Sequence, residues 1–282
     1  MSEKRVTVPE LGRMKTAGEK ITMVTAYDWT FARLLDEAGV DMLLVGDSLG
    51  MVVQGNETTI PVTLDQMVYH TQMVARGARR ALVVGDLPFG SYQASPTQAV
   101  ESSIRLIKEG GAQAVKLEGG VRMAETIEAI ASVDVPVMGH VGLTPQSVHR
   151  MGGHRVQGRR HGTHPGGRER VIEDAKAVEA AGAFAVVLEC IPLDLAAEIT
   201  AELTIPTIGI GAGMHCDGQV LVLHDLVGFS ENWTPRFAKR YAALGREVVR
   251  AAESYVHEVK GGLFPSEAQA FAPEKKAGGS AA

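Results

Sequence analysis

The sequence predicts an α/β protein folded as a single (β/α)8 TIM barrel, and three observations lead to this class. Eight short apolar runs of strand length are separated by amphipathic segments. Most of these runs hardly alternate between apolar and polar residues, which is typical of strands buried on both faces of a parallel sheet. The chain has 282 residues, a length common among single-domain barrels of this class.

The predicted strands are spread along most of the chain. In order they lie at residues 21–26, within 36–47, at 81–85, within 108–118, at 135–139, within 179–189, at 207–210 and at 220–223. In three of these places, within 36–47, 108–118 and 179–189, the preceding helix ends at a glycine. Glycine adopts the left-handed conformation of a helix C-cap at little cost. This alternation of helix and strand implies a parallel sheet.

The segments between the strands have recognisable helix starts. Thr63 with Gln66, and Ser95 with Gln98, fit the capping-box pattern, and Pro96 fits the first helical position. Eight strand and helix units favour closure into a barrel, with an open doubly wound sheet as the alternative. No Gly-x-Gly-x-x-Gly motif opens a helix after the first strand, so the open sheet lacks its dinucleotide-binding fingerprint.

The composition argues against a nucleic-acid-binding, a disulfide-bonded or a membrane protein. A net charge of −5 and an aromatic content of 5% offer nucleic acid neither attraction nor a stacking platform. Cys190 and Cys216 fit no disulfide or metal-binding spacing, which indicates reduced thiols and a cytoplasmic protein. No stretch fits a signal peptide or a membrane span, so we expect a soluble protein. We expect one barrel domain at residues 1–272 and a disordered tail at residues 273–282.

One long irregular stretch, residues 143–167, follows the fifth predicted strand and is rich in Gly, His and Arg. Loops of this length inside compact domains are typically lids or binding loops, so we expect a mobile loop over the barrel mouth. Its arginines either bind an anionic substrate or are simply solvated residues of a surface loop. The glycine-rich run at residues 209–213 either accepts a phosphate group or makes a tight exit from the seventh strand.

Charged residues end five consecutive predicted strands, from the second to the sixth. They are Asp47, Asp86, Lys116, Glu118, His140 and Glu189. A turn or capping role explains any single one of them, because Asp is common at strand-to-helix junctions. Active sites of such barrels lie at the carboxyl ends of the strands, so the whole set indicates one site there. Lys116 and Glu118 point to the same side of their strand, because side chains alternate.

The chemistry of this set favours a hard cation. Two or three carboxylates without a neighbouring cysteine suit Mg2+, which binds through oxygen. Zinc is the alternative, since five of the nine histidines lie within residues 140–164, but their spacing fits no zinc motif. His140 either hydrogen-bonds a substrate or is a structural histidine. Ser48 either caps a helix or binds a carboxylate. Cys190 has no adjacent activating group, which favours an inert thiol.

Around these residues the sequence resembles the ketopantoate hydroxymethyltransferase family. The resemblance covers residues 20 to 265 and is carried by segments that follow in one order. They are TAYD at 25–28, VGDSLGM at 45–51, DLPF at 86–89, VKLEGG at 115–120, GHVGLTPQ at 139–146, LECIP at 188–192, IGIGAG at 208–213 and HD at 224–225. Eight ordered segments are far more specific than any single motif. The stretch at residues 159–167 is more basic and richer in histidine than we expect of this family.

The resemblance implies a (β/α)8 barrel that binds Mg2+ and transfers a one-carbon unit from 5,10-methylenetetrahydrofolate to 3-methyl-2-oxobutanoate. The product would be 2-dehydropantoate, a precursor in pantothenate biosynthesis, and the enzyme would be a cytoplasmic homo-oligomer, a decamer.

The resemblance also implies roles for individual residues. Asp47 and Asp86 would hold the metal and contact the substrate, with Glu118 in or near the metal shell. Ser48 and Lys116 would bind the oxo acid, and His140 would contact it. Glu189 would be the general base. Each role falls on a position that matches one of the quoted segments.

Two other hypotheses remain open from the sequence. One is a Mg2+-dependent lyase or mutase of the phosphoenolpyruvate mutase and isocitrate lyase type, whose barrels have a Gly-Asp-Ser-like turn after an early strand. Such enzymes often carry a reactive cysteine in the loop over the site, and residues 143–167 contain none. The other is a catalytically inactive barrel with an assembly or regulatory role, against which the intact set of strand-end charges argues.

Overall fold

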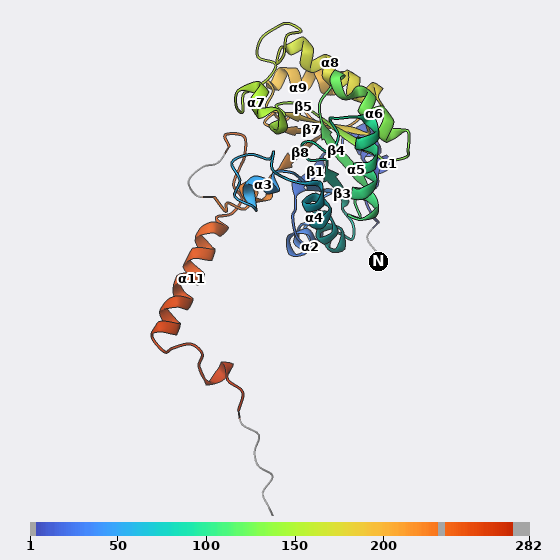
Figure 1. Cartoon of the computed structure of the whole chain (residues 1–282). Helices are drawn as coiled ribbons and strands as arrows, with labels where there is room; N and C mark the ends of the chain where they lie inside the picture. The colour runs from blue at the N-terminus through green and yellow to red at the C-terminus, as the bar shows by residue number, and fades with distance from the viewer. Residues whose placement is uncertain (1–3, 231–234, 273–282) are drawn as a thin grey trace, which may run out of the picture.

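The computed structural model describes residues 4–230 and 235–272. Its eight parallel strands form a closed barrel in chain order, β1 to β8 (Figure 1). The strands are β1 Ile21–Thr25, β2 Met42–Val45, β3 Leu82–Asp86, β4 Ala114–Glu118, β5 Val137–Gly142, β6 Ala185–Glu189, β7 Thr207–Ile210 and β8 Gly218–Leu221. β8 pairs with β1 in parallel and closes the ring. The barrel is therefore confirmed over the open sheet, and the tail expected at residues 273–282 lies outside the described residues.

Helices precede, connect and follow the strands of the barrel. They are α1 Val8–Ala17, α2 Trp29–Glu37, α3 Leu49–Val52, α4 Leu64–Gly77, α5 Pro96–Lys108, α6 Ala124–Ala131, α7 Val148–Met151, α8 Arg168–Ala180, α9 Leu193–Glu202, α10 Leu223–Leu226 and α11 Leu244–Lys260. Three short 3-10 helices are η1 Val121–Met123, η2 Pro145–Ser147 and η3 Glu267–Gln269. Among the described residues, no helix is long and apolar enough to cross a membrane.

The predicted helix starts are confirmed with one correction. Thr63 and Gln66 form the full reciprocal capping box of α4. Ser95 caps α5 by accepting a hydrogen bond from the backbone of Gln98, and Pro96 occupies the first turn. The other half of the second box is wrong, because the side chain of Gln98 accepts from the backbone of Ala94 instead.

Two strands lie elsewhere than the apolar runs suggested. The fifth was expected at residues 135–139 but runs from Val137 to Gly142, because pairing extends to Gly142, which lies beside Glu189 of β6. The eighth was expected at 220–223 but begins at Gly218, which pairs with both β1 and β7. A Cβ atom at residue 218 would lie 2.5 Å from the carbonyl oxygen of Ile21. Strand neighbours, and not hydropathy alone, decide these bounds.

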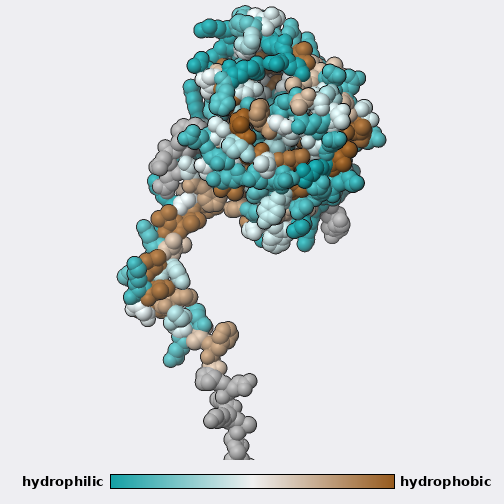
Figure 2. Space-filling model, in the orientation of Figure 1, coloured by the Kyte–Doolittle hydropathy of each residue, from teal (hydrophilic) through white to brown (hydrophobic). Residues whose placement is uncertain are grey.

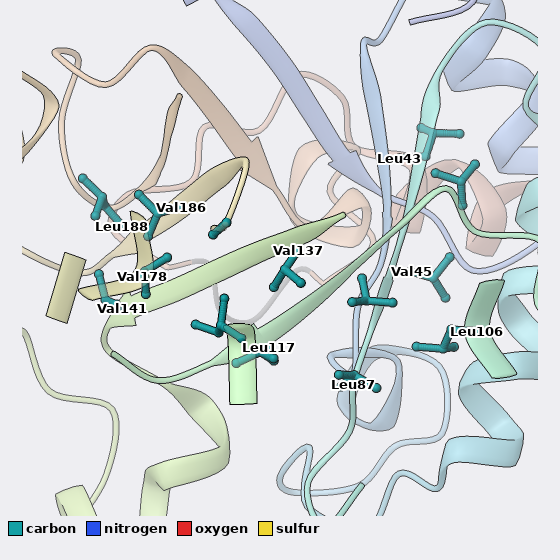
Figure 3. Close-up of a cluster of buried hydrophobic side chains, with 14 of the residues drawn as sticks. Leu43, Val45, Leu87, Leu106, Leu117, Val137, Val141, Val178, Val186 and Leu188 are labelled. Atoms are coloured by element: carbon teal, nitrogen blue, oxygen red, sulfur yellow. The ribbon is translucent and has the colours of Figure 1, made fainter. Parts of the chain in front are cut away.

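The apolar core has two layers. One fills the inside of the barrel and includes Met23, Leu44, Val84 and Met138. The other lies between the strands and the surrounding helices, and Figure 3 shows part of it. Its labelled side chains are Leu43, Val45, Leu87, Leu106, Leu117, Val137, Val141, Val178, Val186 and Leu188. Alternate residues of each strand supply the two layers, which explains why the strands read as nearly unbroken apolar runs.

Gly139 on β5 packs closely against α8, and this contact allows a test of core packing. A Cβ atom there would lie 2.3 Å from Cγ1 of Val178. We expect Gly139→Ala to lower the free energy of unfolding by about 1–3 kcal/mol, the usual cost of an overpacked core. Urea denaturation measures this difference. Gly12→Ala on α1 is the control, because nothing lies within 4 Å of its Cβ position; a helix interior there should gain about 0.5–1 kcal/mol. Equal stability of Gly139→Ala and the wild type would contradict this packing.

The eighth strand is not followed by a long helix packed on the barrel. It leads into α10, which has four residues, and then into α11, which has 17. Helix α11 extends away from the barrel body (Figure 1). None of its residues is buried. Figure 2 shows apolar residues along this helix, and these side chains are exposed within the described part of the chain.

Candidate active site

The candidate site is the end of the barrel interior at which the strands have their carboxyl ends, called the upper end below. Every second residue of a strand points into the barrel, and those further from this end are apolar, such as Val84 on β3 and Met138 on β5. Two residues further along each of these strands, toward its carboxyl end, lie Asp86 and His140, both buried. The same period of two places Lys116 and Glu118 above Ala114 on β4, and Glu189 above Val187 on β6. The strand alternation therefore carries the charged residues of β3 to β6 into the barrel. Asp47 was expected at the end of the second strand but lies in the turn two residues after β2.

Lys116 lies at the centre of the charged set. Its Nζ atom is 2.8 Å from Oδ1 of Asp86 and 3.4 Å from Nδ1 of His140. Burial alone would lower the pKa of Lys116, but the carboxylates of Asp86, Glu118 and Asp47 outweigh it and raise the pKa above its usual range. The ammonium form of Lys116 is therefore favoured, and it lies within reach of both Asp86 and His140.

Carboxylates outnumber this one cation. Asp47, in the turn after β2, donates its backbone N–H to Oδ2 of Asp86 at 3.3 Å. Burial and the charge of Asp86 raise the pKa of Asp47 to about 7. Burial and the charge of Asp47 raise the pKa of Glu118 well above its ordinary value. Buried carboxylates that repel one another in this way favour a bound cation.

Glu189 and His140 face each other across the end of the site. Oε2 of Glu189 is 3.0 Å from Nε2 of His140, although the angle is not that of a hydrogen bond. The side chain of Glu189 is 15% exposed, against 2–4% for Asp86, Glu118 and His140. Glu189 is therefore the carboxylate of these strand ends that solvent and a ligand reach most easily. His140 lies within β5 and not at its end, which corrects its predicted position.

The residue after Glu189 turns the chain sharply out of the barrel. Cys190 has a φ of 48°, donates its backbone N–H to Ile210 at 2.9 Å and accepts from Gln157 at 2.9 Å. Burial, together with the charge of Glu189, raises the pKa of the Cys190 thiol to about 12. This protonated thiol agrees with the prediction that Cys190 is not a nucleophile.

Ser48 lies beside Asp47, before the short helix α3, and its side chain makes no capping bond there. Its hydroxyl instead shares a hydrogen bond of 2.9 Å with the Tyr27 hydroxyl. Burial raises the pKa of Tyr27, so its phenol stays neutral. The helix-cap alternative for Ser48 is therefore wrong, and a hydroxyl pair stands next to the carboxylates.

Gln146 and Tyr92 belong to this site, and no chemical pattern in the sequence indicated either. Both side chains are buried, at 5% and 1% exposure. Gln146 donates to Oδ2 of Asp47 at 2.9 Å and accepts from the Tyr92 hydroxyl at 2.8 Å. Gln146 and Tyr27 lie in segments that carried the family resemblance, which was the only available signal for them. Tyr92 lies outside those segments.

The stretch at residues 143–167 was expected to be an irregular loop over the mouth. It begins with buried residues, among them Leu143 and Thr144, and continues into η2 and α7. Its distal part is held by a bridge between Arg160 and Gly167. Among the described residues, no three His, Cys, Asp or Glu side chains form a group that could hold a metal ion. This holds for the histidines of the zinc alternative and for the three carboxylates Asp47, Asp86 and Glu118 alike, so a cation at the strand ends would take no more than two of these side chains together with water or substrate oxygens.

A cavity of about 510 Å3 lies under this stretch, at the exits of β6 and β7. Its walls include Val156, Arg159, His161, Ile191 and Gly211. Ile191 follows Glu189 by two residues in the chain, which places this space after the end of β6. No member of the charged set is among the residues that line it.

Two solved structures with the same fold are distant from this chain in sequence. Phosphonopyruvate hydrolase matches with a TM-score of 0.61 and 12% identity, covering 95% of this chain and 92% of that one. The 2,3-dimethylmalate lyase, described as a member of the PEP mutase/isocitrate lyase superfamily, matches with a TM-score of 0.57 and 17% identity over 94% and 91% of the two chains. At these identities the likeness concerns the fold alone.

Sequence relatives are much closer. A protein of Pelobacter propionicus is 57% identical over 95% of this chain and 98% of its own length. A protein of Geobacter metallireducens is 54% identical over 95% and 99%. Both are named 3-methyl-2-oxobutanoate hydroxymethyltransferase. The family model for ketopantoate hydroxymethyltransferase matches residues 5–267. The chain therefore belongs to the ketopantoate hydroxymethyltransferase family of enzymes.

Proposed function

We propose that this protein is a 3-methyl-2-oxobutanoate hydroxymethyltransferase. It would transfer a one-carbon unit from 5,10-methylenetetrahydrofolate to C3 of the oxo acid and form 2-dehydropantoate in cytoplasmic pantothenate biosynthesis. The observation that carries the proposal is the pairing of a buried cation with an accessible base. Lys116 is held by Asp86 at 2.8 Å, and Glu189 is the most exposed of the strand-end carboxylates. The names of the close relatives support the acceptor and the transfer.

The carboxylates of the site fit a magnesium ion. Asp47 and Asp86 would hold it, with Glu118 beside it, because Mg2+ commonly uses one or two carboxylates and keeps its remaining positions for water and substrate. Two features support this fit: three buried carboxylates face the single ammonium group of Lys116, and the pKa of Asp47 is raised to about 7. When bound, Mg2+ supplies positive charge that stabilises the negative charge developing on the oxo acid oxygens.

Side chains of this protein would bind the substrate, stabilise its charge and move the proton. The Ser48 hydroxyl would bind the carboxylate of the oxo acid, and His140 would contact the same substrate. The Lys116 ammonium would stabilise charge on the keto oxygen. Glu189 would take the proton from C3 as the general base. The resulting carbon nucleophile bonds to the methylene carbon of the folate donor, and both C–N bonds of that carbon break in the course of the reaction. One water supplies the hydroxyl group, and its other proton and the proton taken from C3 end on the two folate nitrogens as tetrahydrofolate leaves.

Hydrogen exchange tests this proposal and separates it from the lyase or mutase alternative. In deuterated water with Mg2+, the protein should exchange the C3 hydrogen of 3-methyl-2-oxobutanoate without folate, and should form 2-dehydropantoate only when the donor is added. A dicarboxylate lyase shows neither result. An inactive barrel would bind neither Mg2+ nor the oxo acid. Absence of both exchange and product in the presence of Mg2+ would refute the proposal.

Magnesium affinity should depend on pH near neutrality. Because the pKa of Asp47 is raised to about 7 without metal, protons compete with Mg2+ for this carboxylate. The competition disappears well above pH 7 and grows below it. We expect the dissociation constant for Mg2+ to rise by up to about tenfold between pH 7 and pH 6, since one proton is displaced per ion. Titration calorimetry at pH 6, 7 and 8 measures this, and equal affinity at all three would contradict it.

We further propose that the enzyme is a homo-oligomer, a decamer as in the family it resembles. Helix α11 supports self-association, because its apolar side chains lie on one face and remain uncovered. Val248, Val249 and Tyr255 are 60%, 57% and 57% exposed. Exposed apolar patches of this kind typically form protein interfaces.

Substituting the apolar face of α11 should change the assembly. The double variant Val249→Asp with Val256→Asp places two charges on this face, and we expect it to have a lower mass by light scattering than the wild type. Ser254→Asp, on the opposite face of the helix, is the control and should keep the wild-type mass. An unchanged mass for the double variant would show that α11 is not part of the interface.

A further inference from the structure

Gln146 contacts three exits of the barrel at once. Its side-chain amide donates to Oδ2 of Asp47 at 2.9 Å, after β2, and to the carbonyl oxygen of Leu87 at 3.0 Å, after β3. Its backbone N–H donates to Oε2 of Glu118 at 3.0 Å, at the end of β4. A single residue of the connection after β5 therefore holds one oxygen of each of two carboxylates.

The orientation of the Gln146 amide is fixed by its neighbours. Its Oε1 accepts from the Tyr92 hydroxyl at 2.8 Å and from Nε2 of Gln93 at 3.1 Å. Its Nε2 faces the two oxygen acceptors of Asp47 and Leu87. A flipped amide would place oxygen against oxygen and nitrogen against a donor, so all four bonds require the orientation observed.

Tyr92 extends the same network to the backbone of β4. Its hydroxyl lies 3.1 Å from the carbonyl oxygen of Glu118 and accepts from the Glu118 N–H at 3.2 Å. A hydroxyl has one hydrogen, and its shorter contact is to Gln146 at 2.8 Å. Burial raises the pKa of Tyr92 well above its ordinary value, which keeps that hydrogen in place. Tyr92 thus supports Gln146 from the side opposite Asp47.

We propose that Gln146 is a positioning residue for the cation site, and that the Tyr92 hydroxyl holds it in place. By fixing Oδ2 of Asp47 and Oε2 of Glu118, Gln146 sets the direction of the other oxygen of each carboxylate before a cation arrives. A carboxylate free to rotate would pay the cost of ordering on binding. This inference rests on the proposed function, since the cation is the Mg2+ proposed there.

The arrangement also joins the metal site to the stretch at residues 143–167. Gln146 is the fourth residue of that stretch and forms part of η2. Placement of Asp47 and placement of the start of this stretch therefore depend on each other. Any displacement of Gln146 removes a hydrogen bond from a buried carboxylate, which is costly in the interior.

The test compares Mg2+ binding by full-length variants, measured by calorimetry with Mg2+ alone. Gln146→Met keeps the volume and removes the side-chain hydrogen bonds, and we expect its dissociation constant for Mg2+ to rise about 10- to 100-fold, the usual effect of losing a group that orients a metal ligand. Tyr92→Phe should raise it less. In activity assays the Mg2+ requirement of Gln146→Met should rise while its kcat recovers at saturating Mg2+, which a general loss of structure would not produce.

Gln157→Met is the matched control, because this glutamine is also buried in the same stretch but its amide donates to the carbonyl oxygen of Arg155 and, among the described residues, to no carboxylate. Its Mg2+ affinity should equal that of the wild type. Unchanged affinity in Gln146→Met, or equal weakening in both glutamine variants, would overturn the inference. If Gln146→Met fails to fold, Tyr92→Phe decides, and a wild-type affinity there would overturn it. A wild type that does not bind Mg2+ would instead refute the metal site itself.

Discussion

Glu189→Gln should abolish hydrogen exchange at C3 of 3-methyl-2-oxobutanoate, lowering the rate by about 100- to 10,000-fold, the range attributed to a general base. Gln has the same shape but cannot accept the proton. Glu189 is the natural candidate because its side chain is 15% exposed, whereas the other strand-end carboxylates are nearly inaccessible. Deuterium incorporation followed by NMR, with Mg2+ and without folate, measures the effect.

Two controls make this result specific. Binding of the oxo acid to Glu189→Gln, measured by calorimetry, should persist, because Ser48 and Lys116 are unchanged. Glu202→Gln, at the exposed end of α9 where Glu202 pairs with Lys176, should exchange at the wild-type rate. Exchange near the wild-type rate in Glu189→Gln would assign the base to another group, and His140, 3.0 Å away, would be the next candidate.

Lys116→Met should lower the free energy of unfolding by about 3–5 kcal/mol, the cost of breaking a buried ion pair from one side. Met fills similar space but leaves Asp86, Glu118 and Asp47 without their cation. The pKa values of Asp47 and Glu118 are raised by burial even with Lys116 present. Their ionised forms are the destabilising ones, so the loss should be largest above pH 7 and shrink as the pH falls and they bind protons. Urea denaturation at pH 5.5 and pH 8 measures both quantities.

The control for this variant is a lysine at the surface. Lys176→Met removes an ion pair with Glu202 whose side chains are 56% and 40% exposed, and should change stability by less than about 1 kcal/mol. Mg2+ should recover part of the stability of Lys116→Met, since it supplies positive charge to the same carboxylates. A Lys116→Met protein as stable as the wild type at pH 8 would show that the carboxylates do not depend on this cation.

The positions of the strand-end residues could be predicted from the local sequence pattern. Lys116 and Glu118 are two residues apart on one strand, and Asp86 and Glu189 end buried apolar runs. Alternation of side chains and the position of barrel active sites then suffice to bring them together. The structure confirms that these side chains share the upper end of the barrel, at the distances given above.

The sequence pattern could not predict the hydrogen-bond partners of these residues. Gln146 lies 99 positions from Asp47 along the chain, and Tyr27 lies 21 positions from Ser48. Neither a glutamine nor a tyrosine carries a local signature of such a contact. The bounds of β8 and the separation of α11 from the barrel also depend on neighbours distant in sequence.

The sequence by itself determined the alternation of eight strands with helices and the charged set at the strand ends, and it favoured a closed barrel over an open sheet. Both follow from periodicity and order, because burial on two faces requires continuous apolar runs and alternation fixes which side chains point inward. Only the tertiary structure decided which carboxylate is exposed, which charges pair with Lys116, and that Gln146 hydrogen-bonds both Asp47 and Glu118. These properties depend on distances between separate strands, and the register and curvature of the barrel set those distances.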